Sequence, residues 1–147
     1  MKKVKVVCGV VYNNKNEILI TQRGDQKNYK KWEFPGGKVK PKEELNKSIK
    51  RELKEELNVV VYPIKVIYSN TYKKYDLIFI ECLYETGTIE LNEHLDYNWT
   101  KIKDLGNYNF LEGDKEFINH LLTRPHWVPN LLSYGTHGVP LQIIKYW

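Results

Sequence analysis

The sequence predicts a single domain of the α/β class with a mixed sheet. Strand-like segments stand on both sides of a long charged segment with helical periodicity, and a second helical segment follows near residue 120. The chain has 147 residues, of which 41% are hydrophobic and 13% aromatic, enough for one hydrophobic core. It contains no run of about 18 apolar residues, so we expect no membrane span.

The first third of the chain predicts paired strands. Residues 4–12 are rich in β-branched side chains and alternate loosely, residues 13–16 have turn chemistry, and residues 17–23 return as a second strand. The apolar start has no small-residue cleavage site, which favours a strand over a signal peptide. Residues 24–31 form a polar loop, and residues 32–37 a short extended segment.

Three further strands and a helix are expected after residue 58. Residues 59–69 have a strand pattern in which Pro63 indicates an edge or a bulge. Residues 75–84 form the most continuous strand, which ends at residues 85–87. Residues 97–101 predict a short strand, and residues 115–122 a helix introduced by Gly113 and Asp114.

The charged helix between residues 36 and 59 carries a cluster of carboxylates. Glu52, Glu55 and Glu56 stand at i, i+3 and i+4 and therefore share one helix face. Like charges at this spacing repel one another, so a counter-charge is expected, and carboxylate oxygens favour Mg²⁺ or Mn²⁺ over zinc. The alternative is an ordinary solvated Lys/Glu helix. Another face carries an apolar stripe: Leu45, Ile49, Leu53 and Leu57.

The spacing around this cluster decides between the two interpretations. Gly37, five residues, Glu43, seven residues and then RELKEELNV resemble the Nudix box, G-x5-E-x7-R-E-U-x-E-E-x-G-U, where U is a bulky aliphatic residue. Only the last glycine differs, because Asn58 occupies its place. That position ends the helix and favours a left-handed backbone, which Asn adopts more readily than other non-glycine residues.

The similarity extends beyond the box to the MutT branch of the family. Residues 21–23, 31–38, 91–99 and 110–114 resemble the corresponding MutT segments, so the resemblance covers roughly residues 3–122. It implies a Nudix α/β/α sandwich over residues 1–123. Residues 124–147 are not similar to the family, and their apolar side chains indicate packing over the domain or against a dimer partner, or a segment without function.

The resemblance implies Mg²⁺- or Mn²⁺-dependent hydrolysis of a nucleoside triphosphate to the monophosphate and pyrophosphate. The implied metal ligands are Glu52, Glu55, Glu56 and the carbonyl of Gly37. Glu93, outside the helix, is a further ligand or the general base. Glu52 is the competing base, and Glu56 is expected to be essential for turnover.

Other residues are assigned supporting or substrate-binding roles by the same resemblance. Arg51 is expected to orient the carboxylates and to pair with Glu43, and Arg23, one of only three arginines, to contact phosphate. Weaker phosphate candidates are three lysines: Lys38, Lys73 and Lys74.

Two residues are candidates for contact with the base. Phe34 either stacks on the base or belongs to the core. Asp114 suits an amino group such as that of cytosine when ionised, and an oxidised guanine when protonated. Asp114 is also a preferred N-cap residue for the last helix.

Composition leaves several properties open. The net charge of +5 fits attraction of polyanions such as nucleotides, or simply an AT-rich genome. Cys8 and Cys82 stand in apolar surroundings, which indicates buried reduced thiols in a cytoplasmic protein. Alternative substrates are a dinucleoside polyphosphate or a capped RNA end. A non-catalytic nucleotide-sensing domain is the remaining alternative, and the protein is a monomer or a homodimer.

Overall fold

A computed structural model describes residues 2–123 and places seven strands in one mixed sheet. The main path runs β3-β2-β1-β6-β5, while β4 pairs with β1 and β7 pairs with β2. The pair β1–β6 is parallel and the other pairs are antiparallel. The strands are β1 (Val4–Tyr12), β2 (Ile18–Arg23), β3 (Trp32–Glu33), β4 (Gly36–Lys38), β5 (Val60–Tyr72), β6 (Tyr75–Thr86) and β7 (His94–Thr100).

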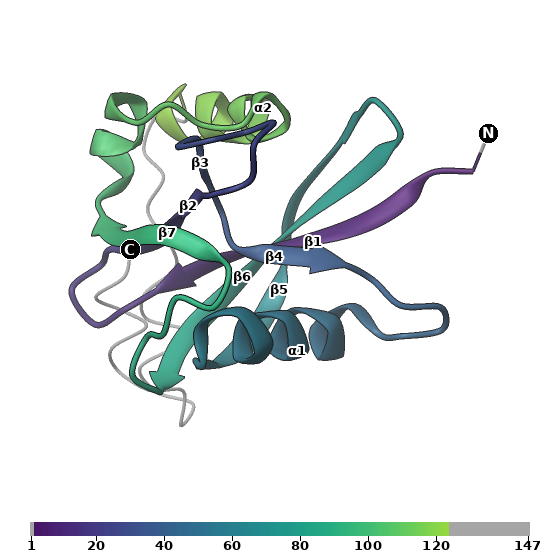
Figure 1. Ribbon diagram of the computed structural model, residues 1–147, viewed down its shortest axis with the longest axis horizontal. Helices are drawn as coiled ribbons and strands as arrows, with labels where there is room; N and C mark the ends of the chain where they lie inside the picture. Colours follow the sequence, from purple (N-terminus) through teal and green to yellow (C-terminus); the bar gives the residue numbers. More distant parts are fainter. Residues whose placement is uncertain (1, 124–147) are drawn as a thin grey trace.

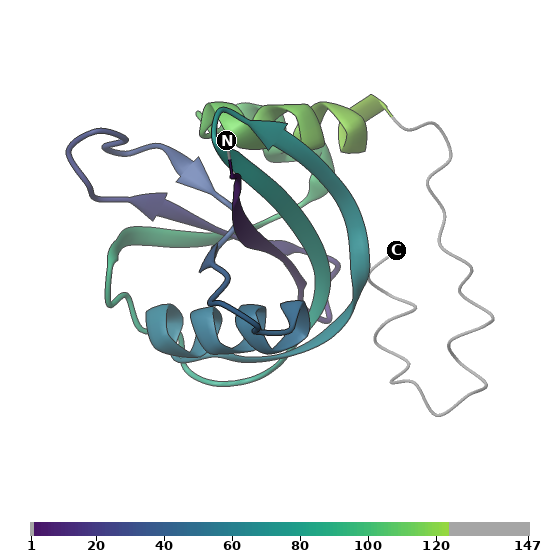
Figure 2. The ribbon, with the colours of Figure 1, turned by 90° about the vertical axis from the view of Figure 1, so that its right-hand side faces the viewer.

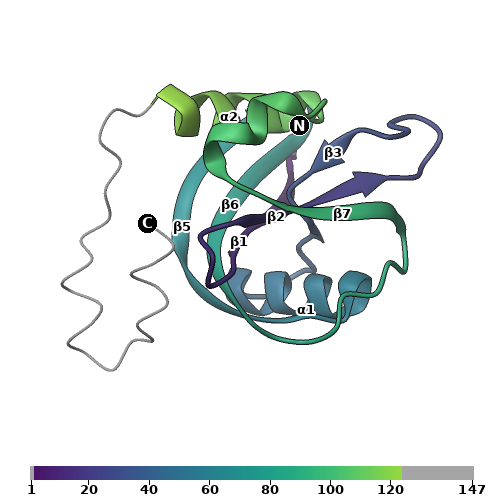
Figure 3. The same ribbon diagram turned by 90° about the vertical axis from the view of Figure 1, so that its left-hand side faces the viewer.

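Two helices cover opposite faces of this sheet (Figures 1 and 2). Helix α1 spans Leu45–Leu57 and helix α2 spans Glu112–Thr123, with a short 3₁₀ helix, η1, at Ile102–Asn107. The predicted mixed α/β class and the α/β/α sandwich are both confirmed. Figure 3 shows the same layers from the side opposite to Figure 2, with β7 beside its partner β2.

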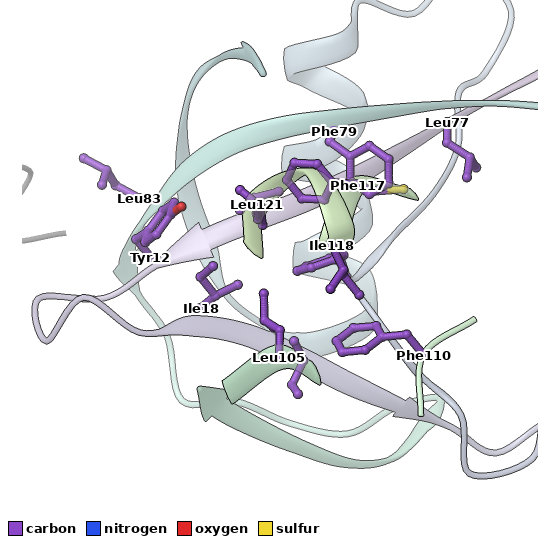
Figure 4. Close-up of a cluster of buried hydrophobic side chains, with 14 residues drawn as sticks. Tyr12, Ile18, Leu77, Phe79, Leu83, Leu105, Phe110, Phe117, Ile118 and Leu121 are labelled. Atoms are coloured by element: carbon purple, nitrogen blue, oxygen red, sulfur yellow. The ribbon is translucent and has the colours of Figure 1, made fainter. Parts of the chain in front are cut away.

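The central strand β1 is buried on both faces and so separates two cores. Val7 and Val11 point into the core under α1, whereas Val10 and Tyr12 point into the core under α2. Figure 4 shows this second core, which is the more aromatic one. Because β1 packs against both layers, it fixes the position of α1 relative to the rest of the sheet.

Helix α1 lies on the sheet through the apolar stripe that its sequence predicts. Ile49, Leu53 and Leu57 are fully buried and Leu45 is partly buried. Gly9 of β1 lies under the helix, and a β-carbon there would stand only 3.2 Å from Leu53 Cδ1. The absent side chain therefore lets the helix approach the sheet closely, and the acidic face of the helix is turned away from the core.

The predicted element boundaries agree with the structure in the first third of the chain and differ later. Strand β7 begins at His94 and α2 begins at Glu112, each three residues earlier than predicted. Helix η1 was not expected, because a single 3₁₀ segment is too short to show a periodic pattern. Pro63 lies on the edge strand β5, next to a shift in the β5–β6 register, so both features that it indicated are present.

The two cysteines are free buried thiols, as predicted. Among residues 2–123 there is no helix with the length and apolar character needed to span a bilayer. The alternatives proposed for residues 124–147 lie outside the described residues.

The end of α1 confirms the left-handed backbone expected at Asn58, which occupies the last glycine position of the Nudix box. Asn58 has φ 58° and ψ 33°, in the left-handed region, and its N–H donates to the Lys54 carbonyl (3.1 Å).

We predict that Asn58→Ala lowers the free energy of unfolding by ~1 kcal/mol, because alanine is disfavoured in the left-handed region, whereas Asn58→Gly does not lower it. Urea unfolding with unchanged m values measures both. An alanine variant as stable as the wild type would contradict this account.

Candidate active site

Arg51 organises the acidic face of α1. Its Nε and Nη2 atoms bind both carboxylate oxygens of Glu43, at 2.7 and 2.9 Å. Its Nη1 atom binds Glu52 Oε1 at 2.9 Å and Glu55 Oε1 at 2.8 Å. These contacts match the counter-charge and the Glu43 pairing expected from the sequence. Hydrogen bonding to the guanidinium is also the main reason why the pKa of Glu43 falls to about 2.

Gly37 lies directly against the carboxylate of Glu52. A β-carbon at Gly37 would overlap both Glu52 carboxylate oxygens and the carbon that joins them. One residue earlier, a β-carbon at Gly36 would overlap the Val7 carbonyl of β1. The glycine pair therefore allows β4 to lie between the sheet and the helix, with Gly37 next to Glu52.

Glu56 lies at the centre of a group of carboxylates. It is partly buried, and one oxygen, Oε1, is enclosed without a hydrogen-bond partner among the described residues. Glu52, Glu33 and Glu93 all act on it electrostatically, and Glu93 is also within hydrogen-bonding reach. Burial first and these like charges second raise the pKa of Glu56 to about 9. Among residues 2–123, no cationic side chain pairs with this enclosed oxygen.

Glu33 is a site residue that the sequence analysis missed. Its Oε1 atom binds Arg23 Nη1 (3.2 Å) and its Oε2 atom binds His94 Nε2 (2.8 Å). These partners come from β2 and β7, which pair with a register shift beside Arg23. A signal was present, because an acid between Trp32 and Phe34 in an extended segment is unlikely to be a simple core position. Strand pairing was needed to show what it binds.

The structure places Asp114 beside Phe34 and corrects one of its expected roles. Helix α2 begins at Glu112, so Asp114 lies inside the first turn and not at the N-cap. It is 4% exposed, and its Oδ2 atom accepts the backbone N–H of Phe34 (3.3 Å). Burial first, and the charge of Glu33 second, raise the pKa of Asp114 to about 8.

The Phe34 ring belongs to the core in this structure. It is 2% exposed, stacks on Phe110 with ring centres 5.3 Å apart, and meets the edges of Phe79 and Phe117. The ring thus occupies the core position that the sequence left open and is not free to stack on a base. Its backbone N–H, rather than its ring, points to Asp114.

The three lysine candidates lie in different places, with Lys73 and Lys74 together in the turn between β5 and β6. Lys38 is in β4, and its carbonyl accepts a hydrogen bond from Arg51 Nη2 (3.2 Å), so its backbone belongs to the site. Lys73 is in the turn between β5 and β6, where its ammonium lies over the ring of Tyr72 (5.3 Å) and its carbonyl accepts a bond from Lys3. The structure therefore does not bring Lys73 together with the site carboxylates.

The residues present fit a hard divalent cation. The carboxylate oxygens around Glu56 are donors that such a cation prefers, and the enclosed Glu56 Oε1 lacks a partner that a cation would supply. Within residues 2–123, however, no three acidic, imidazole or thiol groups are already arranged as a metal site. The Arg51 contacts explain this, because they engage Glu52 and the mostly exposed Glu55.

Comparison with known proteins identifies the family. A model of the NUDIX domain matches residues 2–121. The chain belongs to the Nudix family. This Nudix chain is 36% identical over 124 residues to an 8-oxo-dGTP diphosphatase of Buchnera aphidicola subsp. Schizaphis graminum, covering 82% of this chain and 95% of the relative. It is also 42% identical over 60 residues to an 8-oxo-dGTP diphosphatase of Escherichia coli, covering 40% and 46%.

Solved structures agree with this assignment. A MutT structure from a study of the Aliivibrio salmonicida and Vibrio cholerae proteins has a TM-score of 0.69 at 26% identity and covers 85% of this chain and 100% of its own. MutT of Methanosarcina mazei has a TM-score of 0.67 at 26% identity and covers 82% and 93%. The predicted resemblance to the MutT branch is confirmed, and the protein is a Nudix hydrolase.

The raised pKa of Asp114 predicts a stability that falls with pH. The folded protein retains a proton on Asp114 up to about pH 8, whereas the ordinary pKa of an Asp is 3.8. The unfolded chain therefore loses this proton first, and the free energy of unfolding decreases between these two values by at most ~1.4 kcal/mol per pH unit. Asp114→Asn retains an acceptor for Phe34 without a charge, so its stability should depend less on pH and exceed that of the wild type at pH 8.

Urea unfolding of both proteins at pH 5, 6.5 and 8 measures this difference. Glu56 contributes a slope of the same sign in both proteins, so only the difference between them reports on Asp114. Parallel curves for the two proteins would show that Asp114 is already ionised in the folded state.

Proposed function

We propose that this Nudix hydrolase cleaves an oxidised purine nucleoside triphosphate to the monophosphate and pyrophosphate, with Mg²⁺ or Mn²⁺, and so removes damaged nucleotides. The observation that carries the proposal is the group of carboxylates around Glu56, which has the oxygen donors for divalent cations and an enclosed oxygen without a partner. The relatives named 8-oxo-dGTP diphosphatase support the choice of substrate. Two buried free thiols fit a reducing compartment such as the cytoplasm.

In this proposal Glu52, Glu55, Glu56, Glu93 and the Gly37 carbonyl would hold the cations. Such cations neutralise phosphate charge and make an attacking water more acidic. Arg51 keeps Glu52 in place through its Nη1 contact, and Gly37 leaves the space that the Glu52 carboxylate needs. The Glu52 carboxylate is thus held in position before the nucleotide binds, and such positioning is the main contribution a protein makes to phosphoryl transfer.

The hydrolysis requires a base for the attacking water. The water oxygen bonds to phosphorus, the bond to the leaving phosphate oxygen breaks, and the water proton passes to a carboxylate. Glu52 and Glu93 are the two candidates for this carboxylate. The guanidinium of Arg23 lies beside this group of carboxylates. It donates to Glu33 at 3.2 Å and to Asp25 at 2.6 Å, which fixes its position. We propose that this guanidinium contacts the phosphate chain.

Asp114 favours an oxidised guanine over cytosine. With a pKa near 8, its carboxyl group is mostly protonated at neutral pH and can donate a hydrogen bond as well as accept one. A protonated carboxyl group suits a base edge with a carbonyl oxygen next to an N–H, as 8-oxoguanine presents, better than the amino group of cytosine.

A substrate panel tests the proposal. Normal and oxidised nucleoside triphosphates, dinucleoside polyphosphates and capped RNA are compared by kcat/KM, with and without Mg²⁺, for the full chain and for residues 1–123. We expect an oxidised guanine nucleotide to give the highest kcat/KM, with monophosphate and pyrophosphate as products. Cleavage of capped RNA or of a dinucleoside polyphosphate alone would contradict it. The absence of any hydrolysis would favour a nucleotide-sensing domain.

Removal of one site carboxylate gives a second prediction. Glu56→Gln should lower kcat by about 100-fold, equivalent to ~2.7 kcal/mol in activation free energy, because the amide is a poor ligand for a divalent cation. The fold should persist, because burial and the neighbouring carboxylates already favour the uncharged form of Glu56, which the amide resembles in shape. Steady-state kinetics and circular dichroism measure the two effects. The matched control is Glu44→Gln, an exposed glutamate immediately before α1, which should retain full activity.

A further inference from the structure

The last carbonyl groups of α1 are bound by the segment between β6 and β7. The final carbonyls of a helix have no partner inside the helix and need one elsewhere. The Glu90 N–H donates to the Leu57 carbonyl at 2.9 Å. Asn92 makes two such bonds, from its N–H to Glu56 O (3.2 Å) and from its Nδ2 to Glu55 O (2.8 Å). Figure 3 shows this segment passing along α1 before it enters β7.

The beginning of the same segment is attached to the helix end as well. Gly87 has φ 115°, and a β-carbon there would overlap the Asn58 carbonyl. Asn58 Nδ2 also donates to the Thr88 carbonyl at 3.4 Å. The segment is therefore attached to the end of α1 from Gly87 to Asn92.

Asn92 differs from the other attachment points in what it connects. It binds the backbone of Glu55 and Glu56, which are both proposed cation ligands, and it directly precedes Glu93. Asn92, with its two hydrogen bonds to the helix, is therefore joined by a single peptide bond to Glu93. Glu93 is the only proposed carboxylate ligand that does not come from α1. The side-chain bond requires an N–H donor, which an amide supplies and a carboxylate does not.

We propose that Asn92 is a positioning residue, which holds Glu93 against the carboxylates of α1 through its two bonds to the helix backbone. This inference rests on the proposed hydrolase function. Asn92 acts through Glu93 and does not itself contact the nucleotide. Loss of its side-chain bond leaves Glu93 tied to the helix by the backbone bond alone, so the cation ligands no longer form one rigid unit.

The test compares Asn92→Ala and Asn92→Leu with the wild type, and leucine is chosen because it retains the side-chain volume without a donor. Mn²⁺ binding to the full chain is measured by electron paramagnetic resonance without nucleotide, and kcat and KM are measured separately. We expect Mn²⁺ affinity and kcat each to fall about 10-fold, the scale seen when supporting partners of metal ligands are removed. The KM for the nucleotide should change less than about two-fold, because ground-state contacts with the nucleotide are retained.

The control is Asn58→Gly, which removes the bond to Thr88 but retains the left-handed backbone at the helix end. This variant should retain the Mn²⁺ affinity and kcat of the wild type. Unchanged Mn²⁺ affinity in both Asn92 variants would overturn the inference, and so would equal losses in the Asn58→Gly control. If the wild type hydrolyses no triphosphate, the proposed function fails, while the Mn²⁺ titrations still decide whether Asn92 positions Glu93.

Discussion

Repulsion among carboxylates is the constraint on which this structure depends. Glu33, Glu52 and Glu93 come from three separate parts of the chain and act on Glu56, whose charged form is disfavoured by burial first and by these like charges second. Arg51 offsets part of this cost for the helix by binding Glu43, Glu52 and Glu55 together. No described cation reaches the enclosed oxygen of Glu56. This unpaired oxygen is what sets the site apart from the ion pairs that Arg51 makes on the same helix face.

The two cores make this arrangement possible. The core under α1 fixes the helix through Ile49, Leu53 and Leu57, so the acidic face has one orientation. The core under α2 fixes β3 and the following residue through the ring of Phe34, which packs among other aromatic rings. Neither core contains a carboxylate from the α1 cluster, but both set the distance between the helix and β3. Hydrophobic packing on both faces of the sheet therefore stabilises the positions of the site residues.

The parts of the site that the sequence predicts are those set by local spacing. Glu43 and Arg51, eight residues apart, could be paired because the resemblance to the Nudix box implies that contact. Glu33 and His94 could not be paired in this way. Their contact depends on β3 and β7 both pairing with β2, and on a register shift beside Arg23 that no local pattern encodes.

The fold also divides into elements that the local sequence predicts and elements that depend on tertiary packing. Strand β1 has the predicted boundaries, because its β-branched residues and the following turn residues define both ends. The first turn of α2 was not predicted, because Gly113 within it is a weak helix former. The structure shows why a glycine stands there: a β-carbon would lie 2.8 Å from Leu77 of β6. Close packing between helix and sheet, a tertiary effect, overrides the local preference.

Residues 33 and 34 connect the two ends of the site. The Glu33 carboxylate binds Arg23 and His94 on the side of the phosphate candidates, and the next residue donates its N–H to Asp114 on the side of the base candidates. The charge of Glu33 also raises the pKa of both Asp114 and Glu56. Burial is the larger cause at both carboxyl groups, and the charge of Glu33 adds to it at each. The two parts of the site are therefore joined electrostatically as well as through the backbone of residues 33 and 34, although Asp114 comes from α2 and Glu56 from α1.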